Sequence, residues 1–217
     1  EIGSGLVGSE MCIRDSLNST FSIGGLIGYI QDNNTIKNSF VQDLNINETS
    51  SLNVEGIGGI AGSTQTDSTY KNITNCYVIG NINTTKGNGG GIVGKAENIY
   101  ISICMSKVNI NAQEDNIAGI VGKITAVAGN SANSIEDNLV LGNLYSTNID
   151  AEDINRIIGS GEKAENNYAY DNQLINGEIL TDELGANVLS YNEIFDESTY
   201  NNICLLYTSP SPRDRSL

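Results

Sequence analysis

The side chains available for chemistry in this chain of 217 residues are four cysteines and 26 acidic residues, and the chain has no histidine. Without an imidazole, a Ser-His-Asp triad, a Cys-His pair and an H-E-x-x-H zinc helix are excluded. Two cysteines, Cys76 and Cys104, lie in the interior of the sequence. They are too few for a disulfide scaffold and are not spaced as metal ligands. We therefore predict no catalytic residue, no metal ligand and no cofactor.

The acidic residues lie in the polar breaks between short apolar runs. Clusters occur only at Glu114-Asp115 and Asp150–Asp153, and neither an EF-hand loop nor a G-G-x-G-x-D array is present. We expect these residues to be solvated, and weak calcium binding is the alternative. Glycoside hydrolysis would need paired carboxylates in a cleft with stacking aromatics, of which the composition gives little sign. The scattered acids are Asp32, Asp43, Glu48, Asp67, Glu97, Glu114, Asp115, Asp150, Glu152 and Asp153.

The formal net charge of −15 restricts the partners. A polyanion would be repelled, so we predict no binding to nucleic acid. No run of about 18 apolar residues is present, so we predict no membrane insertion.

Both ends of the chain differ from its middle. The segment Cys204–Asp214 matches, codon by codon, the translation of a transposase-type sequencing adaptor, and Leu6–Asp15 matches the reverse complement of that adaptor. We therefore expect residues 1–16 and 204–217 to be adaptor-derived and non-native, and the remainder to be an internal fragment of a longer reading frame.

A repeat of about thirty residues organises the middle of the chain. Its first block is Gly24-Gly-Leu-Ile-Gly28, followed by related blocks whose second residues are 34, 32, 28 and 37 positions apart. A second block, such as Ile73-Thr-Asn-Cys-Tyr-Val78, and a third, such as Lys107-Val-Asn-Ile110, recur behind each first block. The later first blocks are Gly58–Gly62, Gly90–Gly94, Ala118–Gly122 and the degraded Asn155–Gly159.

The three apolar runs of each repeat are short, β-branched and alternating, which is typical of strands. Because one repeat cannot bury both faces of its strands, the repeats must stack, each strand pairing with its counterpart about 4.8 Å away. The sequence thus predicts an all-β parallel β-solenoid, or β-helix, of about four to five coils. A short irregular or partly helical C-terminal flank should follow it.

Particular residues acquire roles in this prediction. The glycines of each first block should permit a positive φ at a corner and close approach of neighbouring coils. The column formed by Asn38, Asn75 and Asp137, interrupted by Ile103, should lie at an inward turn and link coils through its amides. Cys76 and Cys104 share a register. We interpret them as small buried thiols, and a disulfide between the two coils is the alternative.

The unit G-G-[IL]-[IVA]-G followed by I-x-N-[SC]-[FY]-V-x-G-x-I resembles the GLUG repeat of bacterial cell-surface and secreted proteins. The resemblance covers about residues 23–144. The stretch that follows, including Asn166–Tyr170, is similar to the segment that closes such arrays in the non-catalytic N-terminal region of immunoglobulin-A-cleaving zinc metallopeptidases. The resemblance implies an extracellular or cell-surface location.

These features favour a non-enzymatic structural or adhesive repeat module that binds a host or cell-wall protein or glycan. An accessory, non-catalytic solenoid of a secreted zinc metallopeptidase is the alternative, and a carbohydrate-active β-helix is a third hypothesis. The domains expected between the two ends are a GLUG-like β-solenoid over residues 17–170 and a C-terminal flank or cap over residues 171–203.

Overall fold

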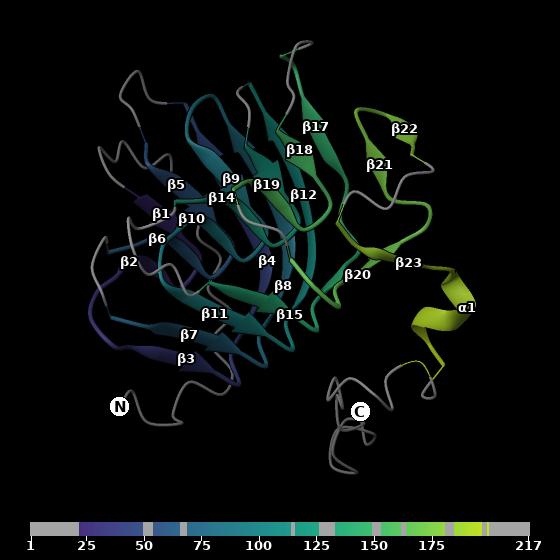
Figure 1. The fold of residues 1–217 in the computed structure, drawn as a ribbon. Coiled ribbons are helices and arrows are strands. Elements are labelled where there is room, and N and C mark those ends of the chain that lie inside the picture. The colour runs from purple at the N-terminus through teal and green to yellow at the C-terminus, as the bar shows by residue number, and fades with distance from the viewer. Residues whose placement is uncertain are drawn as a thin grey trace, which may run out of the picture.

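A computed structural model describes residues 22–49, 54–65, 69–113, 116–125, 133–148, 153–161, 164–180, 185–196 and 199. The adaptor-like ends predicted at residues 1–16 and 204–217 lie outside the described residues. The chain winds into stacked coils whose strands run parallel to their counterparts (Figure 1). The predicted all-β parallel β-solenoid with a partly helical C-terminal flank is confirmed.

Equivalent strands of successive coils form four sheets, which we name A to D. Sheet A contains β1 (Ser22–Gly24), β5 (Gly56–Gly58), β9 (Asn88–Gly90), β13 (Ile117–Ala118) and β18 (Ile154–Asn155). Sheet B contains β2 (Ile27–Ile30), β6 (Ala61–Thr64), β10 (Val93–Ala96), β14 (Val121–Ile124) and β19 (Ile158–Ser160). Sheet C contains β3 (Thr35–Lys37), β7 (Lys71–Thr74), β11 (Ile99–Ser102) and β15 (Ser134–Glu136).

Sheet D is the widest and carries the longest strands. Its first three strands, β4 (Phe40–Glu48), β8 (Tyr77–Thr84) and β12 (Met105–Ala112), each run without a break from the last residues of a second block through the third block. The later coils divide this strand in two. The remaining strands are β16 (Leu139–Val140), β17 (Leu144–Ser146), β20 (Tyr168–Tyr170), β21 (Leu174–Ile175), β22 (Glu178–Ile179) and β23 (Asn187–Leu189).

The pairing register confirms the alignment of the repeats. Gly24 pairs with Gly58 and Gly58 with Gly90, while the second block pairs Ile73 with both Ile36 and Ile101. Each side chain therefore stacks on the same position of the next coil. This in-register pairing produces the columns of like residues on which the rest of the architecture depends.

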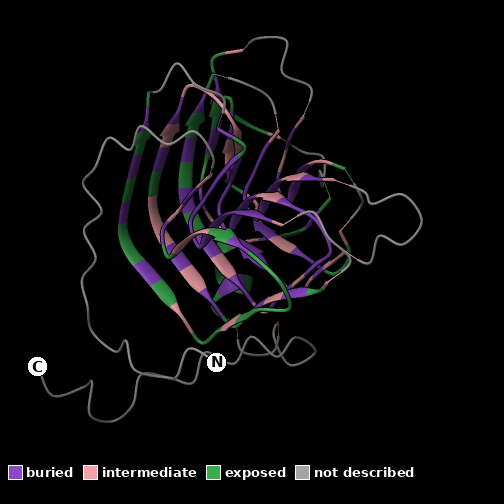
Figure 2. Ribbon diagram, turned by 90° about the vertical axis from the view of Figure 1, so that its left-hand side faces the viewer, coloured by how far each residue is buried: buried purple, intermediate pink, exposed green. Residues whose placement is uncertain are grey.

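Burial alternates along the long strands of sheet D, as a half-buried sheet requires. In β12 the residues Val108 and Ile110 point inward and are buried, whereas Lys107, Asn109 and Asn111 are exposed. Figure 2 shows this alternation along the longest strands. The inward residues of all four sheets form one continuous core, in which Ile92 and Ile120 are fully buried.

The first block contains two strands rather than the single strand that the three-run pattern predicts. The chain bends at its second and third residues, for example Gly91 and Ile92, and this bend separates sheet A from sheet B. The predicted positive φ at these glycines is wrong, since the positive-φ glycines lie elsewhere. The predicted close approach is confirmed: a Cβ added to Gly91 would overlap the carbonyl oxygen of Gly119.

A column of positive φ angles lies instead at the asparagine corner between sheets C and D. Asn38, Asn75, Ile103, Asp137 and Asn166 all have φ between 52° and 56°. The expected inward turn is wrong, because Asn38 and Asn75 are exposed. Their amides do link coils, since Asn75 Nδ2 donates to Asn38 Oδ1 at 2.7 Å. Asparagine suits this corner because it enters the left-handed region at low cost.

Beyond the last full coil, the chain covers the end of the solenoid. Arg156 occupies the position that is glycine in the earlier first blocks, and its side chain is fully buried. It donates to the carbonyl oxygens of Tyr170 and Leu180 and to Gln173 Oε1. Strand β22 pairs antiparallel with β21, and the short helix α1 (Tyr191–Ile194) begins at Ser190 with a capping box.

Candidate binding surface

The predicted chemistry-bearing residues do not come together in one place. The two thiols are buried in the core between sheets C and D. Among the residues that the structure describes, no group of three or more His, Cys, Asp or Glu residues could hold a metal ion. No helix in the described part of the chain is long and apolar enough to cross a membrane.

Cys76 and Cys104 follow the positive-φ corner in successive coils, and both are free and fully buried. This confirms their interpretation as small buried thiols in a shared column. The Sγ of Cys76 contacts the carbonyl oxygen of Thr74 at 3.3 Å, and that of Cys104 contacts Ser102 O at 3.2 Å. Burial raises the pKa of the Cys104 thiol well above its ordinary value, so this side chain is a neutral thiol at pH 7.

The acidic residues follow the predicted solvated pattern only in part. Asp32 and Asp43 are exposed, but Glu48 and Glu97 are buried, which corrects the expectation for those two. Glu48 Oε2 accepts hydrogen bonds from the backbone N–H groups of Thr85 and Lys86 and from the Thr84 hydroxyl. Its burial is therefore compensated by hydrogen bonds. Asp67, Glu114-Asp115 and residues 150–152 of the second cluster lie outside the described residues.

The outward face of sheet D carries an unusual concentration of amides. We name it the amide face and define it by two columns of asparagines that cross β4, β8 and β12. All are exposed except the half-buried Asn83. The first column is Asn45, Asn81 and Asn109, which Asn143 of the next coil continues, and the second is Asn47, Asn83 and Asn111.

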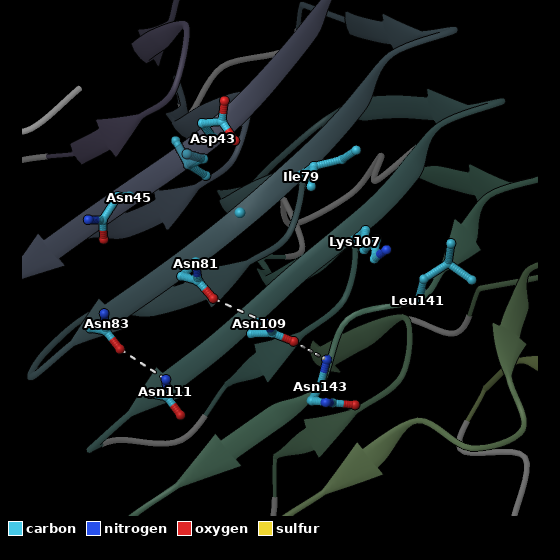
Figure 3. Close-up of a pocket in the computed structure, with 12 residues that line it drawn as sticks. Asp43, Asn45, Ile79, Asn81, Asn83, Lys107, Asn109, Asn111, Leu141 and Asn143 are labelled. Carbon is cyan, nitrogen blue, oxygen red and sulfur yellow. Dashed lines mark hydrogen bonds between the residues drawn. The ribbon is translucent and has the colours of Figure 1, made fainter. Parts of the chain in front are cut away.

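Hydrogen bonds connect the amides from coil to coil (Figure 3). In the second column, Asn83 Nδ2 donates to Asn47 Oδ1 at 2.8 Å and Asn111 Nδ2 donates to Asn83 Oδ1 at 2.9 Å. In the first, Asn109 Nδ2 donates to Asn81 Oδ1 at 3.2 Å, and Asn109 Oδ1 accepts from the backbone N–H of Asn143. These bonds orient the amides without removing them from solvent.

The amide face is shallowly concave. The hollow has a volume of about 730 Å³, and Asp43 and Lys107 are the charged residues among those that line it. Ile79 and Leu141 contribute apolar surface: Ile79 lies between Asp43 and Lys107, and Leu141 lies beyond Lys107 in the next coil. This nearly neutral hollow contrasts with the net charge of −15 on the whole chain.

Beside the amide face, an outward column of larger side chains begins with the stacked rings of Phe40 and Tyr77. The ring centroids lie 5.1 Å apart with an interplanar angle of 8°. Further along the solenoid, Met105 and Tyr168 pack against a small cluster of Leu139, Leu189 and Ile194. Here α1 and β23 cover the column, while Phe40 stays 42% exposed at the opposite end.

Sequence reasoning missed the amide face, although its signal was present. The third blocks of the first three repeats are Asp43–Ile46, Gly80–Ile82 and Lys107–Ile110, and each has an asparagine just before its isoleucine. Because neighbouring side chains along a strand point to opposite faces of the sheet, an asparagine next to a buried isoleucine points away from the core. The repeated asparagine of the third blocks is therefore the sequence signal of the first amide column.

No family model, no curated protein and no solved structure matches the chain.

Proposed function

We propose that this chain is a non-enzymatic structural or adhesive repeat module of a bacterial cell-surface or secreted protein, and that its GLUG-like repeats provide an extended binding surface. The observation that carries this proposal is the amide face, because it is exposed, concave and built by three successive coils. Rigid in-register stacking holds such a surface at constant spacing without a ligand.

Two further observations support binding rather than catalysis. The hollow contains one carboxylate, Asp43, at its margin, whereas glycoside hydrolysis uses a pair of carboxyl groups facing the bond to be cleaved. The nearest aromatic pair, Phe40 and Tyr77, stacks ring on ring, so that each ring covers a face of the other. A partner that binds many weak, regularly spaced hydrogen-bonding groups fits this surface better than a small substrate does.

The proposal is tested by adhesion of beads coated with the full chain to immobilised matrix glycoproteins, cell-wall proteins and cell-wall glycans. Beads coated with Asn81→Arg/Asn109→Arg, in which two long cationic side chains fill the hollow, provide the comparison. Retention of wild-type beads with loss for the double variant is the expected result. If neither protein adheres to any surface, the adhesive function is wrong and a spacer role remains.

A further inference from the structure

We infer that the amide face is a binding site for an extended, neutral polysaccharide that lies along the solenoid axis with about one sugar unit per coil. This inference rests on the proposed adhesive function and names its ligand class. It starts from the hydrogen-bonding capacity that the coil-to-coil bonds leave unused.

A side-chain amide has two N–H donors and a carbonyl oxygen with two acceptor positions. The bond between Asn83 and Asn111 takes one donor from the later residue and one acceptor position from the earlier one, and the bond between Asn81 and Asn109 does the same. Each of these amides therefore keeps donor and acceptor capacity toward solvent. Their side chains are already held in place, so a ligand orders few additional groups on binding.

The spacing of these groups is periodic in two directions. Along the axis, neighbouring coils lie about 4.8 Å apart, which is close to the length of one pyranose unit in an extended chain. Across the sheet, the two columns are two residues apart along each strand, or about 6.6 Å. A sugar ring between the columns can thus direct hydroxyl groups to an amide on either side. Hydroxyls donate and accept like amides, so the two sets of groups are complementary.

The charge of the hollow decides among polymer classes. Asp43 and Lys107 have opposite signs, and the other lining residues are uncharged. Anionic polysaccharides and phosphorylated polymers are bound by clusters of Arg and Lys, which this face does not provide. Extended peptides bind along the edge of a sheet or in an apolar groove, whereas the amide face is the outward, polar face of β4, β8 and β12. A neutral, hydroxyl-rich chain is the remaining match.

The test is isothermal titration of the full chain with neutral oligosaccharides, the series from cellobiose to cellohexaose and mannohexaose, and with an oligogalacturonate as the anionic probe. We expect affinity for a neutral series to rise with chain length and to fall at least about tenfold in Asn81→Ala/Asn109→Ala, since at least two ligand hydrogen bonds are lost. The matched control is Asn72→Ala, which removes a half-buried amide from the outward side of β7 and should leave affinity unchanged.

Thermal melting establishes that the variants are folded, and Asn83→Arg provides a second test by filling the hollow. The inference is overturned if neutral oligosaccharides bind Asn81→Ala/Asn109→Ala and Asn83→Arg as tightly as they bind the wild type. It is also overturned if the oligogalacturonate binds the wild type as tightly as the neutral oligosaccharides do, or if none of these probes binds. In the last case, bead adhesion to a protein surface would preserve the proposed adhesive function, whereas absence of all adhesion would remove both.

Discussion

Each coil turns at two tight corners that use different residues for different reasons. The glycine corner (Gly25, Gly59, Gly91, Gly119 and finally Arg156) has no room for a side chain, because a Cβ would overlap the backbone of the next coil. The asparagine corner (Asn38, Asn75, Ile103, Asp137 and Asn166) faces outward and requires a positive φ. The first corner is constrained by its neighbours in space and the second by its own backbone.

The difference explains which corner tolerates variation. Ile103 and Asp137 occupy the asparagine corner at φ of 56° each, a conformation that costs Ile103 about 1–2 kcal/mol and that Asp, like Asn, enters at low cost. At the glycine corner, the other residue type appears only in Arg156, where the described chain does not place a further coil over that corner. A steric overlap with backbone cannot be relieved locally, whereas an unfavourable dihedral has a bounded cost.

The largest effect should follow from placing a side chain at the glycine corner. In Gly59→Ala the new carbon would overlap the carbonyl oxygen of Gly91 and lie 2.6 Å from a methyl group of Val78, so the coils must separate. We expect the free energy of unfolding to fall by about 3 kcal/mol in urea denaturation. Gly28→Ala is the control, because its added carbon would meet its nearest atom, Ser22 O, at 3.0 Å. Equal losses in the two variants would contradict the steric explanation.

A somewhat smaller loss is expected for Arg156→Met, which keeps much of the apolar volume but removes the hydrogen bonds to Tyr170, Gln173 and Leu180. Leaving three acceptors unpaired, with Gln173 Oε1 buried and the two carbonyl oxygens part-buried, should reduce stability by about 2–3 kcal/mol. Hydrogen exchange should accelerate first in residues 170–180. Lys95→Met, which breaks the exposed ion pair with Glu55 at 3.1 Å, should cost less than about 1 kcal/mol. Exchange that accelerates uniformly over all coils would refute a capping role.

At the asparagine corner, substitution should stabilise the protein. Ile103→Asn replaces a β-branched residue at φ of 56° and should raise the free energy of unfolding by about 1 kcal/mol, since lost packing of the half-buried side chain offsets part of the relief. The reciprocal Asn75→Ile should lower it by a similar amount and break the bond to Asn38. Thermal melting of the two variants and the wild type measures both changes in stability. A loss of stability in Ile103→Asn would show that packing, and not φ, governs this corner.

The smallest effect concerns Asp137, whose pKa is raised by burial and by the neighbouring Glu136 carboxylate. A carboxyl whose folded pKa exceeds its unfolded pKa destabilises the fold when ionised, and the cost disappears as pH falls below the unfolded value. Asp137→Asn should therefore add about 0.5 kcal/mol at pH 7, a value reduced for solvent screening, and nothing at about pH 3. Denaturation at the two pH values checks this. A gain that persists in acid would point to φ preference alone.

The repeat made the fold predictable from the sequence, whereas the candidate binding surface was harder to predict. The aligned isoleucines, Ile36, Ile73 and Ile101, predicted parallel pairing in the register that the structure has. The fourth strand was missed because Gly91-Ile92 reads as part of one apolar run, and only the bend divides it. The amide face was missed because exposed asparagines carry no hydrophobic signal.

The sequence by itself determined the winding, the register and the buried columns, because β-branched residues at period two can be buried only by stacking on their own copies. Only the tertiary structure decided which side of each corner faces inward. It alone placed Asn75 outside, made the amides of three strands neighbours, and directed Arg156 across the end of the core. The reason is physical: the position of a residue along a strand is a local property, whereas the curvature that defines inside and outside depends on how all four sheets close around the core.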